Sequence, residues 1–126
     1  MEGGKKILII EDEEDLAEAL KIKLEGAGFT AGVALDGEEG LKFALADHPD
    51  LILLDIILPG MTGIEVLDRL REDTWGKNVS VIFLTNMDDD KSIAQAMVHQ
   101  SSGYIVKSNT KLEEVVEKVK MTLEEE

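Results

Sequence analysis

Residues Asp50–Gly63 read DLILLDIILPGMTG, and this stretch decides how the rest of the chain is interpreted. The apolar run Leu51–Leu54 has the length and composition of a strand that is buried on both faces. The run ends at a carboxylate, Asp55, and a Pro-Gly pair then interrupts regular structure. Thr62 and Glu65 have the spacing of a capping box, which predicts that a helix begins there. Asp55 is therefore expected at the carboxyl end of a central strand, where open α/β sheets bind ligands, although aspartate is also a common turn residue.

The composition is that of one globular domain with an acidic surface. A chain of 126 residues with 44% hydrophobic residues can bury a core of its own, and the absence of cysteine excludes disulfides and thiolate metal sites. No apolar run reaches the roughly 20 residues that span a membrane, and no signal peptide is recognised, so we expect a cytoplasmic protein. The net charge of -14 argues against direct binding to nucleic acid or to an anionic membrane.

Strand-like and helix-like segments alternate along the whole chain. The expected strands are Lys5–Ile10, Phe29–Leu35, Leu51–Leu54, Val79–Leu84 and Tyr104–Val106. An amphipathic helix is expected after each strand, and capping residues are expected at Asp36, Thr62, Asp88–Asp90 and, as a capping box with Glu113, at Thr110. This alternation, with no linker between the units, predicts a single (βα)5 domain over residues 1–126, with a parallel sheet covered by helices on both faces.

Chemically reactive side chains stand where four of these strands end. They are Glu11 and Asp12 after the first strand, Asp55 after the third, Thr85 after the fourth and Lys107 after the fifth. Each alone is typical of a turn or a surface, and acids also favour the first turn of a helix. Because parallel strands bring their carboxyl ends to one edge of the sheet, we expect the five side chains to converge. Three carboxylates together suit Mg²⁺.

The chemistry expected of such a cluster follows from its charge. Three crowded carboxylates repel one another, and a divalent cation relieves that repulsion. An ionised Asp55 can then attack a phosphorus atom as a nucleophile. Mg²⁺, the Lys107 ammonium and the Thr85 hydroxyl would stabilise charge on the transferred phosphoryl oxygens. The expected product is an aspartyl phosphate.

Four segments of the chain resemble the receiver domain of two-component response regulators, the family that includes CheY. They are IIED at 9–12, LLDIILPGMTG at 53–63, Thr85 after an apolar strand, and YIVK at 104–107. The resemblance covers nearly the whole chain and implies a flavodoxin-like, doubly wound sheet of five strands in the order 2-1-3-4-5. It also implies that a histidine kinase or phosphotransfer protein passes a phosphoryl group from phosphohistidine to Asp55. The domain would then be a signalling switch and not a turnover enzyme.

The same resemblance implies a role for each site residue. The Mg²⁺ ligands would be Glu11, Asp12, Asp55 and the backbone carbonyl of Ile57. Thr85 and Tyr104 match the switch pair, in which Thr85 moves toward the phosphoryl group and Tyr104 turns inward behind it. The switched face would comprise the fourth helix, the fifth strand and the fifth helix. It would bind a downstream protein or an output domain of a longer protein.

Two positions near the expected site depart from the receiver pattern. Receivers usually have a small residue after the switch threonine, where this chain has Asn86, and a proline after the lysine, where it has Ser108. A cis bond before a residue other than proline costs about 2.5–4 kcal/mol, so we expect a trans peptide and a differently placed loop around Lys107. Ile57 and Met87 occupy the positions that flank water access in receivers. Neither can hold a water molecule, so a long-lived phosphorylated state is expected.

Two other functions remain possible for this sequence. A degenerate receiver would act as a constitutive interaction domain, and Mg²⁺ titration would distinguish it from a phosphorylated one. A flavin or nucleotide binder of the same fold would need a Gly-rich or Ser/Thr-rich loop after the first strand. The five consecutive acids Glu11–Asp15 at that place would instead repel a phosphate.

Overall fold

Strands and helices alternate through the residues that the structure, a computed structural model, describes: 4–86, 93–95, 97 and 100–124. The strands are β1 (Lys6–Ile10), β2 (Thr30–Ala34), β3 (Leu51–Asp55), β4 (Ser80–Thr85) and β5 (Gly103–Val106). The helices are α1 (Glu14–Gly26), α2 (Gly37–Asp47), α3 (Gly63–Glu72) and α5 (Leu112–Glu124), with a 3-10 turn at Lys107–Asn109. The helix start expected at Asp88–Asp90 lies outside the described residues.

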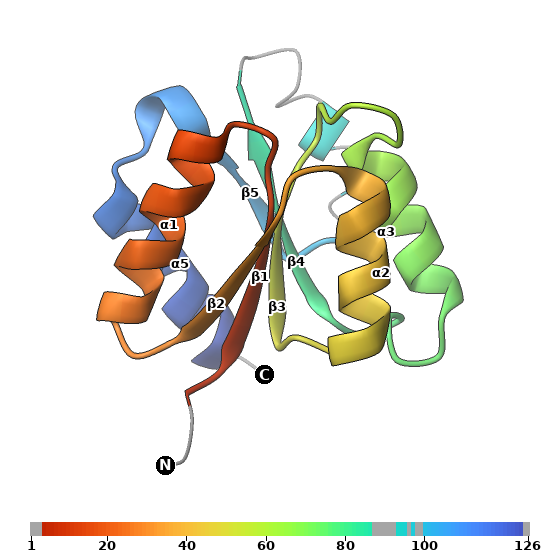
Figure 1. The fold of residues 1–126 in the computed structure, drawn as a ribbon, viewed down its shortest axis with the longest axis horizontal. Coiled ribbons are helices and arrows are strands. Elements are labelled where there is room, and N and C mark those ends of the chain that lie inside the picture. The colour runs from red at the N-terminus through yellow and green to blue at the C-terminus, as the bar shows by residue number, and fades with distance from the viewer. Residues whose placement is uncertain (1–3, 87–92, 96, 98–99, 125–126) are drawn as a thin grey trace.

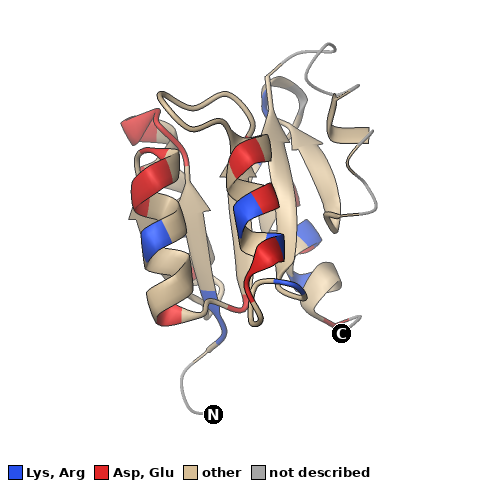
Figure 2. Cartoon of the chain, turned by 90° about the vertical axis from the view of Figure 1, so that its right-hand side faces the viewer, with Lys and Arg blue, Asp and Glu red and all other residues tan. Residues whose placement is uncertain are grey.

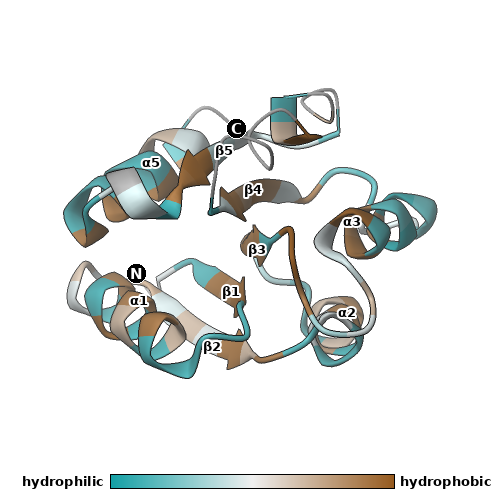
Figure 3. Ribbon diagram, turned by 90° about the horizontal axis from the view of Figure 1, so that it is seen from above, coloured by the Kyte–Doolittle hydropathy of each residue, from teal (hydrophilic) through white to brown (hydrophobic). Residues whose placement is uncertain are grey.

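The five strands are parallel and lie in the order β2-β1-β3-β4-β5, which confirms the expected sheet. Helices α1 and α5 cover one face, and α2 and α3 cover the other (Figure 1). Seen from above, the strands are hydrophobic while the helices carry hydrophilic residues on their outer sides (Figure 3). No helix among the described residues is long and apolar enough to cross a membrane.

Strand β3 is the centre of the core, as its unbroken apolar sequence predicted. All five of its residues are buried. Ile52 and Leu54 pack in the cluster under α2 and α3, whereas Leu51 and Leu53 pack in the cluster under α1 and α5. Because successive side chains of a strand point to opposite faces, a strand covered on both sides needs apolar residues at every position. The continuous LILL run satisfies that requirement.

The ends of the helices follow local sequence signals, with one exception. Thr62 and Glu65 form the predicted capping box, with hydrogen bonds of 3.2 and 2.9 Å between each side chain and the other residue's backbone N–H. The box predicted at Thr110 is wrong. The Thr110 hydroxyl donates to the Val106 carbonyl, and Glu114 accepts from the backbone N–H of Lys111 at 2.8 Å. The 3-10 turn that follows β5 moves the start of α5 to Leu112.

The connection from β3 to α3 depends on a glycine that brings the helix close to the strand end. Gly63 is the first residue of α3, and its backbone N–H donates to the Ile56 carbonyl at 2.8 Å. A Cβ at Gly63 would overlap the backbone oxygen of Asp55. This close approach fixes the loop that begins at Asp55 against the start of the next helix.

Candidate functional site

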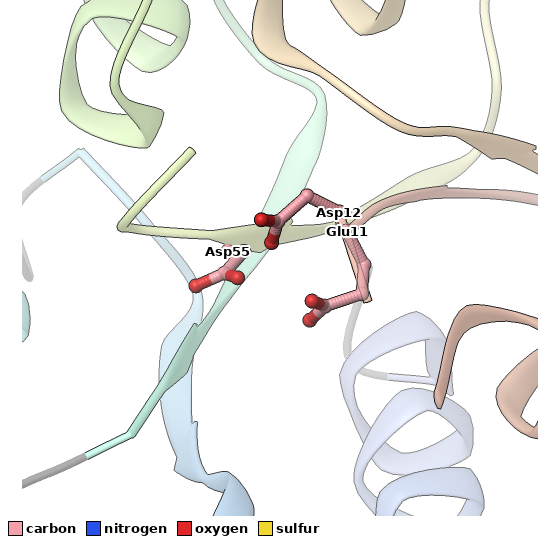
Figure 4. A group of neighbouring side chains, drawn as sticks. All are labelled: Glu11, Asp12 and Asp55. Carbon is pink, nitrogen blue, oxygen red and sulfur yellow. The ribbon is translucent and has the colours of Figure 1, made fainter. Parts of the chain in front are cut away.

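Three carboxylates meet at the carboxyl edge of the sheet. Glu11 and Asp12 follow β1, and Asp55 ends the adjacent β3. Figure 4 shows the three side chains around one small space, and each offers an oxygen within 4.8 Å of the others. Glu11 and Asp55 are buried, with relative exposures of 0% and 2%, whereas Asp12 is exposed. These are hard oxygen donors at a spacing that one divalent cation can span.

Backbone hydrogen bonds fix the two buried carboxylates. Glu11 donates its own N–H to the Ala34 carbonyl at 3.0 Å, and its Oε2 accepts from the N–H of Glu13 at 2.9 Å. Oδ1 of Asp55 accepts from the N–H of Ile57 at 3.2 Å. Each carboxylate thus keeps one oxygen occupied by the backbone and directs the other toward the shared space.

Among the described residues, Lys107 is the only cation that pairs with this cluster. Its Nζ lies 2.9 Å from Oε1 of Glu11 and 3.2 Å from Oδ2 of Asp55, and its side chain is only 9% exposed. The described residues include no cis peptide bond, so the link from Lys107 to Ser108 is trans as expected. With this trans link, the 3-10 turn after β5 directs the Lys107 ammonium to Asp55.

Glu13 is a member of the cluster that sequence reasoning missed. Its carboxylate lies 3.4 Å from the Lys107 ammonium, although the side chain is 58% exposed. The sequence suggested only that it complements the dipole at the start of α1. Its place two residues after Glu11 was an available signal, because that spacing lets the Glu11 carboxylate bind its N–H and turn it toward the site.

Burial and like charge alter the ionisation of the cluster. The pKa of Asp55 is raised to about 7, chiefly by burial and then by the negative charge of Glu11, while the Lys107 ammonium and the Ile57 N–H act in the opposite direction. Burial alone would lower the pKa of Lys107, but its hydrogen bond to Glu11 and the charges of Asp55 and Glu11 raise it overall. The ammonium therefore stays charged, while two buried carboxylates compete for it.

The side chains of Thr85 and Tyr104 have hydrogen-bond partners outside this cluster. Thr85 ends β4 and is fully buried, and its hydroxyl donates to the Ile105 carbonyl at 3.4 Å. Tyr104 is half-buried on β5, and its hydroxyl accepts a hydrogen bond of 3.0 Å from Gln95. The Ile57 side chain is 54% exposed. Met87, expected to flank the site, lies outside the described residues.

The sequence matches the response regulator receiver domain over residues 7–120. It is 37% identical to the DNA-binding response regulator MtrA of Mycobacterium tuberculosis over 119 residues, which cover 94% of this chain and 50% of MtrA. It is 42% identical to the transcriptional regulatory protein DltR of Streptococcus agalactiae over 80 residues, which cover 64% of this chain and 35% of DltR. The matched residues thus cover half the length of MtrA and about a third of the length of DltR.

Solved receiver structures share the whole fold. A CheY-like receiver domain protein from Methanospirillum hungatei has a TM-score of 0.87 at 27% identity, with 98% of this chain and 96% of that chain covered. The receiver domain of a Francisella response regulator has a TM-score of 0.86 at 27% identity, with 97% and 98% covered. The relatives named above are regulators. This chain belongs to the response regulator receiver domain family of two-component signalling.

Proposed function

We propose that this domain accepts a phosphoryl group on Asp55 from the phosphohistidine of a histidine kinase or phosphotransfer protein, and that phosphorylation changes its affinity for a protein partner. The observation that carries the proposal is the setting of Asp55. Its carboxylate is buried, held by the Ile57 N–H at 3.2 Å and paired with Lys107 at 3.2 Å, beside two further acids. A structural aspartate gains nothing from a site where burial and a neighbouring charge both oppose its ionisation.

The donor set fits Mg²⁺. Three carboxylate oxygens within 4.8 Å of one another are the hard ligands that this ion prefers, and a single ammonium leaves the cluster with excess negative charge. Glu11, Asp12 and Asp55 would hold the ion together with the backbone carbonyl of Ile57. The bound ion would neutralise charge on the carboxylates and on the incoming phosphoryl oxygens.

The transfer step uses Asp55, Lys107, which already contacts it, and Thr85 at the end of β4. An oxygen of the ionised carboxylate forms the new bond to phosphorus, and the bond from phosphorus to the donor's imidazole nitrogen breaks, with its electron pair leaving on that nitrogen. The Lys107 ammonium, freed from Oδ2, pairs with a phosphoryl oxygen. Thr85 reaches another phosphoryl oxygen once its hydroxyl leaves the Ile105 carbonyl.

The partner face is proposed to be the fourth helix, β5 and α5. Thr85 and Tyr104 lie on the adjacent strands β4 and β5. A rotation of the Thr85 hydroxyl would therefore change contacts with β5 before those with more distant elements. The Tyr104 hydroxyl is held outward by Gln95, and an inward turn breaks that 3.0 Å hydrogen bond. The named relatives bind DNA or regulate transcription, so the partner would be an output domain of that class or a separate protein. The receiver's own net charge of -14 disfavours DNA as its direct ligand.

Binding of beryllofluoride, a phosphoryl mimic, tests the proposal in the presence of Mg²⁺. Calorimetry should detect binding to the unaltered protein and to Asp68→Asn, a control in which an exposed acid of α3 is neutralised. Asp55→Asn should lose the signal, because the nucleophilic oxygen is gone. Amide shifts on binding should concentrate between Asn86 and Lys118.

Three results of this experiment would contradict the proposal in whole or in part. If Asp55→Asn binds beryllofluoride as the unaltered protein does, Asp55 is not the acceptor. If the unaltered protein binds neither Mg²⁺ nor beryllofluoride, the domain is a constitutive interaction module. Shifts confined to α1 would keep Asp55 as acceptor and reject the proposed partner face.

A further inference from the structure

Gly32 stands in the middle of β2, an edge strand, without a conformational need for glycine. The described glycines with positive φ are Gly28, Gly60 and Gly103, so Gly32 has a backbone that other residues adopt. Crowding does not demand it either, because a Cβ at Gly32 would meet no heavy atom within 4 Å. At Gly63, in contrast, a Cβ would overlap the backbone. A glycine inside a strand often marks a place where a ligand or another backbone approaches closely.

The missing side chain leaves a hollow between β2 and α2. Its volume is about 350 Å³, and its walls include Leu8, Phe43 and Ala46. Ala34 packs in the cluster under α2 and Ala31 in the opposite cluster, so the alternation of the strand places Gly32 on the α2 side. Phe43 is 43% exposed beside the hollow. The hollow can therefore take a large apolar side chain and cover an aromatic ring that now faces water.

The backbone of β2 can pair with another strand at the same place. Strand β2 pairs with β1 on one side and is the last strand of the sheet on the other. The N–H of Thr30 donates to the Lys5 carbonyl at 2.9 Å, so the alternation directs the N–H groups of Ala31 and Val33 outward. An exposed strand edge of this kind accepts an extended peptide through main-chain hydrogen bonds, and neighbouring pockets select its side chains.

Charge around β2 is unequal at its two ends. At the amino end, Lys6 and Asp47 neutralise each other at 3.0 Å. The carboxyl end borders two hollows, lined by the acids Asp36, Glu38 and Glu39 and by Glu14, Asp15 and Glu18, with Lys42 as the one cation among their described lining residues. In Figure 2 acidic residues lie at the upper end of the helices that face the viewer, where the strands finish, and also at their lower ends. This end favours a cationic ligand, and a net charge of -14 disfavours a second copy of the chain.

We propose that the β2 edge binds an extended segment of a partner protein as a sixth strand. One apolar side chain of that segment fills the hollow over Gly32, and its basic residues lie beside the acids at the carboxyl end of β2. Strands β2 and β5 form opposite edges of the sheet, so this partner can bind while the β5 face is used by another protein. The interaction does not require phosphorylation of Asp55.

Two synthetic peptides provide the test. Each has seven residues with blocked ends, a central leucine among threonines, and a Lys-Arg pair at either its amino or its carboxyl end, since the edge can pair in either direction. One of the two should bind with a Kd below about 1 mM and shift the amide signals of Ala31, Val33 and Phe43. A version with glutamates in place of the basic pair should bind at least about tenfold more weakly.

Variants of the protein localise the site. A Cβ at Gly32 would meet no heavy atom within 4 Å, so Gly32→Val should occupy the hollow, keep or raise the melting temperature, and weaken peptide binding at least about tenfold. Phe43→Ala removes one wall of the hollow while leaving Gly32 in place, and it should also weaken binding of the peptide. Ile22→Ala is the matched control, because Ile22 is an apolar residue of α1 that is 61% exposed and does not line this hollow.

Each alternative result overturns the proposal. Failure of both peptides to bind, shifts centred elsewhere, or full binding by Gly32→Val would show that the edge is not a docking site. Equal binding of a peptide N-methylated on alternate residues would show that the hollow takes an apolar side chain without strand pairing. A dimer of the unaltered protein in sedimentation equilibrium that Gly32→Val dissociates would identify a second copy as the occupant.

Discussion

The strands of the sheet begin at its amino edge and end at its carboxyl edge. Both of these edges contain partly buried charges, but the charges are balanced by different kinds of partner. At the amino edge, the Arg71 guanidinium of α3 donates to the carbonyls of Gly76 at 2.7 Å, Val79 at 2.9 Å and Gln100 at 3.0 Å. Burial lowers the pKa of Arg71, yet every partner is a neutral dipole pointing at the cation. At the carboxyl edge, two buried carboxylates share one ammonium.

This difference separates a structural network from a reactive one. The guanidinium joins the loop after α3 to Gln100, and neighbouring contacts support it: Asp73 accepts from the N–H groups of Trp75 and Gly76 at 2.9 and 3.0 Å, and Trp75 stacks on His48. Its hydrogen bonds are formed and need no ligand. The carboxylate cluster remains electrostatically unfavourable in the free protein, so a cation or a change of charge at Asp55 can relieve it.

The largest effect on stability is expected from removing the Arg71 guanidinium, whose hydrogen bonds are all formed. Arg71→Met should lower the free energy of unfolding by about 3 kcal/mol, because three carbonyls lose their donor. Urea denaturation measures this change. Arg69→Met, at an exposed position of the same helix, is the matched control and should change stability by less than about 0.5 kcal/mol. Equal small effects for both variants would show that the amino edge is not held by this network, and the comparison would fail.

Neutralising the buried carboxylate of Asp55 should have a smaller effect on stability, and of opposite sign. In metal-free buffer above pH 7, Asp55→Asn should raise the free energy of unfolding by about 2 kcal/mol, because the folded state no longer carries the ionised buried carboxylate. Lys107 keeps Glu11 as a partner at 2.9 Å in this variant. Asp68→Asn is the control for a lost surface charge.

The gain in stability of Asp55→Asn over the unaltered protein should increase with pH. The pKa of Asp55 in the folded state is raised from 3.8 to about 7, so between these values the unfolded chain is ionised while the folded protein still holds the proton. The unaltered protein must therefore lose stability relative to Asp55→Asn as the pH rises from about 4 to about 7, and the difference should level off above that. Saturating Mg²⁺ should shrink it. A gain that is constant from pH 4 to pH 8 would exclude the ionisation of Asp55 as its cause.

Local patterns and one topological rule were enough to predict most of the fold and part of the site. The continuous run before Asp55 specified a doubly covered strand, and Thr62 with Glu65 specified the start of α3, because each depends on neighbours in the sequence. The meeting of Lys107 with Asp55 followed from the shared carboxyl edge of parallel strands.

What the sequence did not reveal depends on choices between nearly equal local arrangements. The hydroxyl of Thr85 can bind a strand carbonyl or face the site, and packing against β5 selects Ile105 in this state. The Glu13 side chain is 58% exposed, yet its carboxylate lies 3.4 Å from the Lys107 ammonium, a rotamer choice that the sequence does not specify. Likewise, the 3-10 turn after β5 competes with Thr110 as the start of α5. Such differences are comparable with a single hydrogen bond, about 1 kcal/mol, which sequence patterns do not resolve.

The smallest expected effect concerns access to the reactive edge, and it rests on the proposed phosphorylation of Asp55. Hydrolysis needs a water molecule in line with the phosphorus, opposite the Asp55 oxygen. The Ile57 side chain, 54% exposed two residues after Asp55, can neither donate nor accept a hydrogen bond to such a water. Ile57→Asn supplies an amide that can hold it. Phosphate release from the phosphoprotein at saturating Mg²⁺ should therefore become about threefold faster, a barrier change of about 0.7 kcal/mol.

Ile57→Leu separates hydrogen bonding from shape at this position. Leucine keeps an apolar side chain of similar size, so its rate of phosphate release should match that of the unaltered protein. If Ile57→Leu accelerates release as much as Ile57→Asn does, the isoleucine limits water by its shape alone. If neither variant changes the rate, the Ile57 side chain does not control water access. The carboxyl edge would then owe its reactivity to the buried charges at Glu11, Asp55 and Lys107, with no contribution from the exposed residue beside them.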